Sequence, residues 1–353
     1  MKIELAVPHR GQLRGNTVTA ERIRRGLERL GEEVRISFFA AGQDGAAAGD
    51  GGGPAGEEFS PAVLHGFHAY WFEIYRRRRG PSPVPYAVTL TGTDLNHHLY
   101  EPDKRPLVLR CLDGAAAVHV FHEAAARELW REAPSTRGRT HIIAQALEPF
   151  PANGGRGGLP AREPGAFVFL LPAGVRRVKQ IPFALSTLRE LRAVCPAVRL
   201  WLAGPVLEAD EAARVRALVE ANRGWARWLD PLPHHRMGGL YERADAVLNT
   251  SLSEGQSSAV LEAMAQGVPV LAADIPGNRS VVADGATGLL FRDKEQFLAQ
   301  ARRLLADGEW RRALAARARA FVRARHSPES EALALRAMYR SISNAAAMRA
   351  SRP

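Results

Sequence analysis

Two glutamates in the second half of the chain, eight positions apart, enclose a small polar segment. They are Glu254 and Glu262. The segment between them begins with Gly255, Gln256, Ser257 and Ser258. If a helix starts near Gln256, its free N–H groups and its dipole attract a phosphate or diphosphate. Glu254 can then accept hydrogen bonds from sugar hydroxyls, and Glu262, two turns later, can reach a ribose diol. An acidic loop followed by an ordinary surface helix would show the same two glutamates.

Three cations follow a predicted strand over 167–172 in the same half of the chain: Arg176, Arg177 and Lys179. When the bond between a sugar and a phosphate breaks, negative charge gathers on the leaving diphosphate, and fixed cations aimed at that charge lower the barrier. An arginine offers a planar fork to phosphate oxygens, and a lysine offers a point charge. Cations placed in this way could hold a diphosphate, or they could belong to an exposed basic loop.

Five further candidates stand at the ends of strands predicted in the first half of the chain. Gly15 and Asn16 follow the first strand, where a glycine lets the backbone approach a ligand closely. His65, Thr91 and Asp94 stand at the ends of two other strands of the same sheet. Asp94 could orient a second substrate or cap the segment that follows it. We expect His65, Thr91 and Asp94 to face the second substrate, the acceptor, and Gly15 and Asn16 to contact the donor.

No metal site and no cofactor are predicted from the residue spacing. His97 and His98 are neighbours, and adjacent side chains face different ways in a helix or a strand, so we expect solvated histidines rather than a metal pair. Cys111 and Cys195 lie far apart without a CxxC partner, which argues against a disulfide framework or a zinc site.

Alternating strands and helices predict an α/β protein with two Rossmann-like, doubly wound domains. We expect an N-terminal domain over 1–155, a C-terminal domain over 164–327 and a helix over 328–346 that crosses back onto the first domain. A linker rich in proline and glycine separates the two over 151–165. Such domains face each other across a cleft, and ligands bind at the carboxyl ends of their strands.

Composition excludes several other classes of protein. The chain has 353 residues, enough for two cores, and no apolar run as long as the roughly 18 residues of a membrane helix. Its first residues lack the features of a signal peptide, so we expect a cytoplasmic protein without an integral membrane segment. The net charge of +11 comes mostly from arginines on alanine-rich helices, which predicts solvated faces rather than nucleic-acid binding.

The run from Glu254 to Phe291 resembles the C-terminal domain of the family-4 retaining glycosyltransferases, which have the GT-B fold. Glu254 and Glu262 match the E-x7-E motif of that family. The resemblance implies that Glu254 contacts the donor sugar, that Glu262 contacts the ribose and that the amides over 255–257 contact the diphosphate. It implies catalytic roles for Glu254, Lys179 and an arginine, for which we select Arg176. Because Val175 interrupts the usual spacing, the choice between Arg176 and Arg177 stays open.

Motifs along nearly the whole chain resemble the glycosyltransferase 1 domain-containing protein group and, more loosely, the selenosugar synthases of selenoneine biosynthesis. The motifs are GN-x-x-TA from Gly15, LH at His65, TGTD from Thr91, and SEG…EAM. In the family, the loop at Gly15 and Asn16 reaches the diphosphate and the acceptor. The stretch over 229–245 corresponds to the region that receives the nucleotide base. Many members carry a histidine where Thr91 stands, so one acceptor contact is missing here.

The resemblance implies a metal-independent enzyme that transfers a hexose, with N-acetylglucosamine as one candidate, from a UDP-linked donor with retention. The acceptor and the oligomeric state stay open. One alternative is a selenosugar or thiosugar synthase that transfers N-acetylglucosamine to selenophosphate or a related acceptor. Another is a protein that binds nucleotide sugars without catalysis, and a third is a sugar-nucleotide epimerase.

Overall fold

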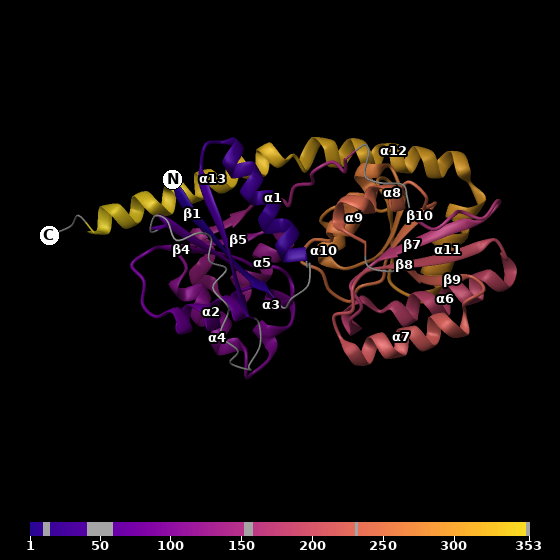
Figure 1. Cartoon of the computed structure of the whole chain (residues 1–353), viewed down its shortest axis with the longest axis horizontal. Helices are drawn as coiled ribbons and strands as arrows, with labels where there is room; N and C mark the ends of the chain where they lie inside the picture. The colour runs from indigo at the N-terminus through magenta and orange to yellow at the C-terminus, as the bar shows by residue number, and fades with distance from the viewer. Residues whose placement is uncertain (10–14, 41–58, 152–157, 230–231, 351–353) are drawn as a thin grey trace. The chain divides into compact units, whose positions relative to one another are not determined.

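The structure is a computed structural model that describes residues 1–9, 15–40, 59–151, 158–229 and 232–350. The chain forms two compact units. The first contains Met1–Ala146 and His326–Pro353, and the second contains Leu147–Arg325. Each unit has a six-stranded parallel sheet with helices packed on both faces, as Figure 1 shows. The two-domain α/β architecture predicted from the sequence is therefore confirmed.

The first sheet has the strand order β2-β1-β3-β4-β5-β6. Its strands are β1 (Lys2–His9), β2 (Glu33–Ala40), β3 (Val63–Phe67), β4 (Tyr86–Thr89), β5 (Ala117–Val120) and β6 (Thr140–Ile142). Its helices are α1 (Gly15–Arg29), α2 (Ala69–Arg79), α3 (Thr93–Asn96), η1 (His98–Tyr100), α4 (Arg105–Gly114), α5 (Glu123–Glu132), η2 (Pro134–Arg139) and α13 (Pro328–Ala350). Alternate residues of each strand face opposite sides of the sheet. One side packs against α1 and α13, and the other packs against α2, α4 and α5.

The last helix, α13, is bound to the first unit by a buried ion pair. Arg22 on α1 donates from Nε and Nη2 to the two carboxylate oxygens of Glu331, each at 2.8 Å. Glu331 also accepts from the amide of Ala146 at 3.2 Å. A bidentate arginine–carboxylate pair fixes orientation as well as distance. The end of the chain thus packs with its beginning, and the helix predicted over 328–346 extends over Pro328–Ala350.

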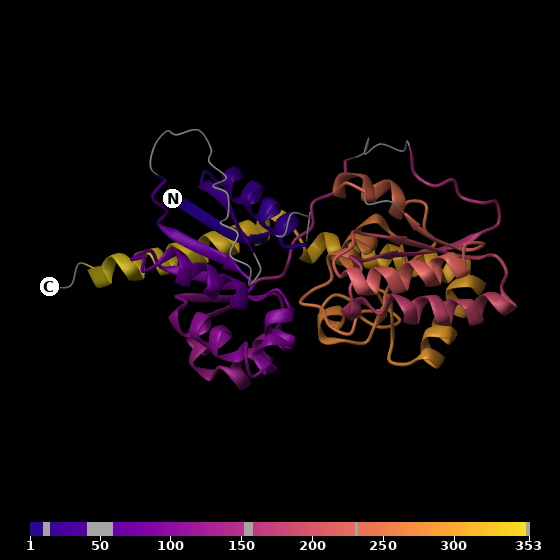
Figure 2. The same cartoon turned by 60° about the horizontal axis from the view of Figure 1, so that its bottom comes forward.

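The second sheet has the strand order β12-β11-β10-β7-β8-β9. Its strands are β7 (Phe167–Pro172), β8 (Val198–Ala203), β9 (Ala226–Leu229), β10 (Ala246–Asn249), β11 (Val270–Ala273) and β12 (Leu289–Phe291). Its helices are η3 (Arg177–Lys179), α6 (Ile181–Val194), α7 (Ala209–Ala221), η4 (His234–Arg236), α8 (Met237–Tyr241), α9 (Ser258–Gln266), α10 (Pro276–Arg279), α11 (Lys294–Ala306) and α12 (Gly308–Arg325). Helices α6, α7 and α11 cover one face, and α8, α9 and α12 cover the other (Figures 1 and 2).

The boundary between the units lies at Ala146 and Leu147, whereas the sequence analysis ended the first domain at 155. Leu147 and Phe150 account for the difference, because both pack against the core of the second unit. In the part of the chain that the structure describes, no helix combines the length and apolar character that crossing a bilayer requires.

Candidate functional site

Two loops that are distant in sequence meet beyond neighbouring strands of the second sheet. β7 and β10 pair in parallel, so their carboxyl ends lie at the same edge. The loop after β10 is hydrogen-bonded to the loop after β7. Leu252 N donates to Val178 O at 2.8 Å, and Thr250 Oγ1 donates to Lys179 O at 2.8 Å. The strand order also reverses between β7 and β10, which is the position where open α/β sheets bind ligands.

Lys179 and Glu254 form an ion pair at this point. Lys179 Nζ lies 2.5 Å from Glu254 Oε1, which also accepts from Ser251 Oγ at 2.7 Å and from Asn249 Nδ2 at 3.1 Å. Burial acts to raise the pKa of the Glu254 carboxyl group. The charge of Lys179 and these hydrogen bonds outweigh burial and hold the pKa below its ordinary value. Glu254 is therefore an ionised acceptor at neutral pH.

Asn249, which the sequence analysis did not select, connects the parts of this site. Its Nδ2 donates to Glu254 and, at 3.0 Å, to Ser257 Oγ. Its Oδ1 accepts from Ser251 N and from Asn278 Nδ2, each at 3.1 Å. All four hydrogen-bonding positions of the amide are thus occupied, which fixes its orientation. The available sequence signal was a polar residue that ends an otherwise apolar strand.

Helix α9 begins at Ser258, two residues after the predicted start near Gln256. Ser257 is the N-cap, and its Oγ accepts from Val260 N at 3.4 Å. Gln256 is buried, and its Nε2 donates to Ser280 Oγ at 3.1 Å. Gly255 lies half-buried beside Glu254. The predicted segment therefore does lead into the amino end of a helix, and that end is adjacent to the Lys179–Glu254 pair.

Arg176 and Arg177 have different environments. Arg176 is half-buried, and its Nε is inaccessible and has no hydrogen-bond partner among the described residues. Arg177 is exposed at the start of η3, and its backbone N donates to Glu208 Oε2 at 2.9 Å. Buried polar atoms usually have a hydrogen-bond partner. Arg176, rather than Arg177, therefore has a buried donor atom that a ligand could satisfy.

Glu262 lies on α9 and is buried between two partners that the sequence analysis did not identify. Tyr241 OH donates to Glu262 Oε2 at 2.7 Å, and His234 Nε2 lies 2.7 Å from Glu262 Oε1. Burial, together with the charge of Glu262, raises the pKa of Tyr241 well above its ordinary value, so the phenol stays a donor. The two partners precede Glu262 by 21 and 28 positions, and no helical or strand period relates residues that far apart.

Among the acceptor-side candidates, Asp94 is saturated by backbone amides. Its Oδ1 accepts from the amides of Thr91, Gly92 and Leu95 at 3.0–3.1 Å, and its Oδ2 accepts from Ala69 N at 2.9 Å. Of the two roles considered for Asp94, the structure thus provides the capping role. Thr91 is half-buried in the same turn.

Gly15 and Asn16 are the first two residues of α1. Gly15 is exposed, and an added Cβ there would meet none of the described atoms within 4 Å. None of the described residues therefore packs closely against this glycine.

His65 is part of a buried hydrogen-bonded chain in the first core. Its Nδ1 lies 2.6 Å from Tyr339 OH, and its Nε2 lies 2.6 Å from Thr89 Oγ1. Thr89 Oγ1 also lies 2.8 Å from His119 Nδ1, and His119 Nε2 donates to Ile143 O at 2.9 Å. Both ring nitrogens of His65 are occupied, so a direct contact with an acceptor would have to break one of these bonds.

This histidine chain makes the stability of the first unit depend on pH. Burial lowers the pKa of His119 to about 4, and burial and His119 lower the pKa of His65 well below its ordinary value. An unfolded histidine titrates at about pH 6.5. As pH falls below that value, only the unfolded chain takes up protons at these two histidines, so the free energy of unfolding decreases.

We expect hydrogen exchange of the β4 and β5 amides to become faster from pH 7 to pH 5, after correction for intrinsic exchange rates, but not from pH 8 to pH 7. Equal protection at pH 5 and pH 7 would contradict this.

The expectation of solvated histidines at 97 and 98 is wrong for His98. His98 is 8% exposed, and its ring packs against those of His68 and Tyr70 with centroid distances of 5.1 and 5.0 Å. It belongs to η1, which packs against α3 and α4. His97 is half-buried, and its Nε2 is also inaccessible, so neither of the two rings is fully solvated. The described residues contain no cluster of three or more side chains that could hold a metal ion.

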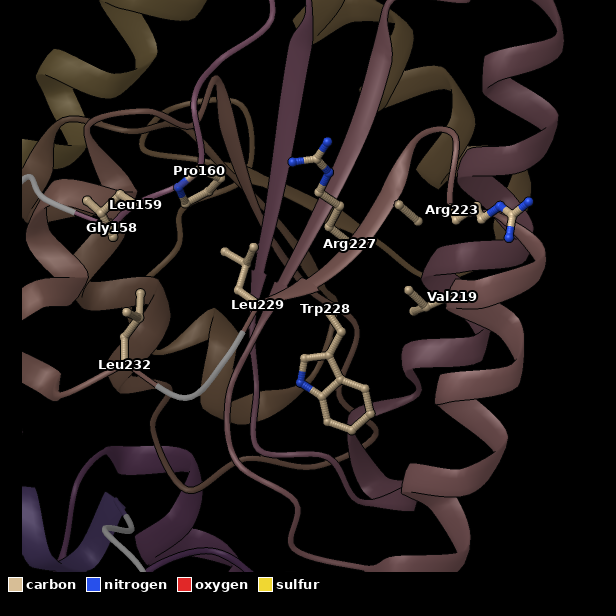
Figure 3. Close-up of a pocket in the computed structure, with 10 residues that line it drawn as sticks. Gly158, Leu159, Pro160, Val219, Arg223, Arg227, Trp228, Leu229 and Leu232 are labelled. Carbon is tan, nitrogen blue, oxygen red and sulfur yellow. The ribbon is translucent and has the colours of Figure 1, made fainter.

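A pocket of about 610 Å³ lies beside the edge strand β9, as Figure 3 shows. It is lined by Gly158, Leu159, Pro160, Val219, Arg223, Ala226, Arg227, Trp228, Leu229 and Leu232. The predicted catalytic and diphosphate-binding residues are not in this lining. Leu229 and Leu232 do belong to the segment predicted to receive the nucleotide base. The pocket therefore adjoins that segment, but not the Lys179–Glu254 pair.

Residues 166–307 match the family model of the glycosyl transferases group 1. The chain is 29% identical over 259 residues to glycosyltransferase 1 domain-containing protein 1 of Xenopus tropicalis, a match that covers 70% of this chain and 74% of that protein. The matched family region runs from β7 to the end of α11. It includes Arg176, Lys179, Asn249, Glu254 and Glu262.

Two solved structures are similar to nearly the whole chain. Sucrose-phosphate synthase from Thermosynechococcus elongatus aligns with a TM-score of 0.78 at 19% identity, over 97% of this chain and 99% of that chain. HepE from Anabaena, solved in complex with UDP and glucose, aligns with a TM-score of 0.74 at 15% identity, over 97% of this chain and 100% of that chain. At such low identity these alignments establish the fold and leave the chemistry to the residues of the site.

Proposed function

We propose that this chain, which has the GT-B fold and matches the glycosyl transferases group 1 model over residues 166–307, transfers a hexose from a UDP-linked donor, with retention and without a metal ion. The ion pair of Lys179 and Glu254 carries the proposal. It brings a cation for the diphosphate and an ionised acceptor for sugar hydroxyls to within 2.5 Å of each other, beside the amino end of α9. The complexes of HepE with UDP and glucose support UDP as the nucleotide.

The leaving diphosphate would be held by cations and by helix amides. Lys179 can turn from Glu254 toward a phosphate oxygen, and the buried Nε of Arg176 would gain the partner that it lacks among the described residues. The amides at the start of α9, next to Gly255 and Ser257, would add the favourable end of the helix dipole. Two side-chain cations and a helix end can balance the diphosphate charge, which is why we propose metal independence.

The two glutamates would then orient the donor. Glu254 accepts hydrogen bonds from sugar hydroxyls while Asn249 and Ser251 keep its carboxylate in place. Glu262 accepts from the ribose diol, with Tyr241 holding the carboxylate from the buried side. His234 occupies the other oxygen of Glu262 in the structure, so the ribose would displace it or share that oxygen.

The proposed reaction needs no protein nucleophile. The bond from the anomeric carbon to the diphosphate oxygen breaks as the acceptor oxygen approaches on the same face, and the acceptor proton passes to the leaving phosphate oxygen. The products are the glycosylated acceptor, with unchanged anomeric configuration, and UDP. The sugar passes through a state that resembles an oxocarbenium ion, and the fixed cations stabilise the charge on the departing group.

Calorimetric titration with UDP, in EDTA and then in Mg²⁺, tests the donor site. We expect UDP to bind equally well in both, because protein cations rather than a metal would neutralise the diphosphate. Arg176→Ala should raise the Kd about tenfold or more, which is the loss expected for a charged hydrogen bond. Arg177→Ala is the matched control and should change the Kd less than about twofold, as for an exposed charge.

Reversed effects of the two arginine variants would assign the diphosphate to Arg177. Absence of UDP binding in the wild type, both with EDTA and with Mg²⁺, would contradict the proposed donor. Titration of a panel of UDP-hexoses, UDP-N-acetylglucosamine included, would then name the sugar. The anomeric configuration of the product, read by NMR, tests retention.

A further inference from the structure

We propose that His68, Tyr70 and His98 form a binding subsite for a neutral, hydroxyl-bearing acceptor in the first unit. The inference rests on the transferase function proposed above and adds the chemical class of the acceptor. Aromatic rings suit the apolar faces of a sugar or polyol, and a neutral imidazole nitrogen can exchange a hydrogen bond with a hydroxyl group.

The position of the cluster follows from the topology of the first sheet. The strand order reverses between β1 and β3, and open parallel sheets bind ligands beyond the carboxyl ends of the strands at such a point. His68 follows β3 directly. The equivalent reversal in the second unit, between β7 and β10, carries Lys179 and Glu254. The cluster therefore lies at the position in the first sheet that corresponds to the position of Lys179 and Glu254 in the second sheet.

Two buried ring nitrogens beside this point lack a protein partner. His98 Nδ1 and His97 Nε2 are both inaccessible and have no hydrogen-bond partner among the described residues. His98 is 8% exposed as a whole, so water is largely excluded from it. Nearby Asp94, in contrast, accepts four backbone hydrogen bonds. Buried polar atoms are nearly always satisfied, so an orphan buried nitrogen indicates a partner from outside the chain.

The backbone at His68 is held in a costly conformation. Its φ is 69° and its ψ is 96°, in the region that favours glycine. Such a residue persists where its surroundings impose the conformation, as at ligand clamps. Here the conformation holds the His68 ring with its centroid 5.1 Å from that of His98, and the centroid of the Tyr70 ring lies 5.0 Å from that of His98. Half-buried Trp71 lies 6.4 Å from His68 and extends the aromatic surface outward.

The charges around His98 favour a neutral ligand. Lys104, the cation that acts on His98, is ion-paired with Glu101. Burial, then His68 and Lys104, lower the pKa of His98 to about 4, against the opposing charges of Asp94 and Glu101. The ring is therefore uncharged at neutral pH. An oxyanion such as phosphate or selenophosphate would have to compete with Glu101 for Lys104, whereas a hydroxyl group needs no cation.

NMR of the histidine rings in the full-length protein, saturated with UDP, tests the proposal. Two matched pairs of probes differ only in charge: glycerol with glycerol 3-phosphate, and myo-inositol with myo-inositol 1-phosphate. The His98→Phe variant keeps a ring of similar size, removes both nitrogens and identifies the His98 signal. His141→Phe, at a half-buried histidine of β6, is the control.

We expect a neutral probe to shift the His98 signal more than its phosphate ester does. His98→Phe should weaken binding of that probe about tenfold or more, read from the tyrosine and tryptophan signals, and His141→Phe should not. A response to the phosphate esters alone would make the cluster an anion site, and no response to any probe would leave the orphan nitrogens as a feature of the fold. Either result overturns the proposal. UDP binding in the same samples tests the donor site separately.

Discussion

We expect replacement of Lys179 by alanine to lower kcat/KM for sugar transfer about 100- to 1,000-fold, the range found when a preorganised charge-stabilising group is removed. Lys179 would balance charge on the departing diphosphate, and that charge is largest in the transition state. Loss of the ammonium group also leaves Glu254 buried without its main counter-charge. Because burial acts to raise the pKa of this carboxyl group, the pKa of Glu254 rises in the variant.

Two readouts separate these effects of Lys179→Ala. Steady-state rates at neutral pH report the loss of the cation, and the acidic limb of the pH–rate profile moves to higher pH as Glu254 becomes easier to protonate. Lys294→Ala is the control, because Lys294 is an exposed lysine of the same unit, paired with Glu190. A Lys179→Ala enzyme that retained more than about a tenth of the wild-type rate would exclude Lys179 from the charge-stabilising role.

The meeting of the loops that carry the proposed donor site could be predicted because each loop follows a strand. Lys179 and Glu254 lie after β7 and β10, and parallel strands bring their carboxyl ends to one edge whatever the separation in sequence. The amino end of a helix was likewise predicted from its glycine and serine pattern, with an error of two residues at Ser258. These inferences depend on strand direction and on local helix capping, and both can be predicted from a single sequence.

The residues that hold the glutamates in place could not be predicted in the same way. Tyr241 and His234 meet Glu262 only through tertiary packing, and the hydrogen bonds of Asn249 depend on the exact position of α10. For Asp94 the sequence suggested a possible contact with a ligand where the structure has contacts with the backbone. A carboxylate at a strand end is the same in sequence whether its partner is a ligand or, as here, four backbone amides.

Helix α2 is an element that its own sequence does not indicate. Its first half contains Tyr70, Trp71 and Phe72, and aromatic residues are weak helix formers. Phe72 is fully buried in the core, and this tertiary contact outweighs the local preference. His68 caps the helix in a left-handed conformation that no sequence rule assigns to histidine at this place.

Gly277→Ala is expected to lower kcat/KM about tenfold or more although no charged or polar side chain is lost. A Cβ on Gly277 would stand 2.5 Å from Glu254 O and 2.9 Å from Glu254 Cβ, closer than real side chains approach. Gly277 lies in α10, and its backbone needs no left-handed conformation, so the clash alone acts. The backbone of Glu254 must then move, and a displacement of about 1 Å in a positioned group can cost about 100-fold in rate.

Gly224→Ala is the matched control for Gly277→Ala, because the same atoms are added where no described atom lies within 4 Å. Thermal unfolding of both variants shows whether the fold is retained, and UDP titration shows whether the diphosphate site is. If Glu254 mainly orients the sugar, the Gly277 variant should keep UDP affinity within about threefold while the rate of transfer falls, since an interaction used in the transition state affects kcat. Equal losses of UDP affinity and rate would instead mean that α10 supports the whole donor site. A variant with wild-type rate would show that the loop after β10 can move without moving the carboxylate.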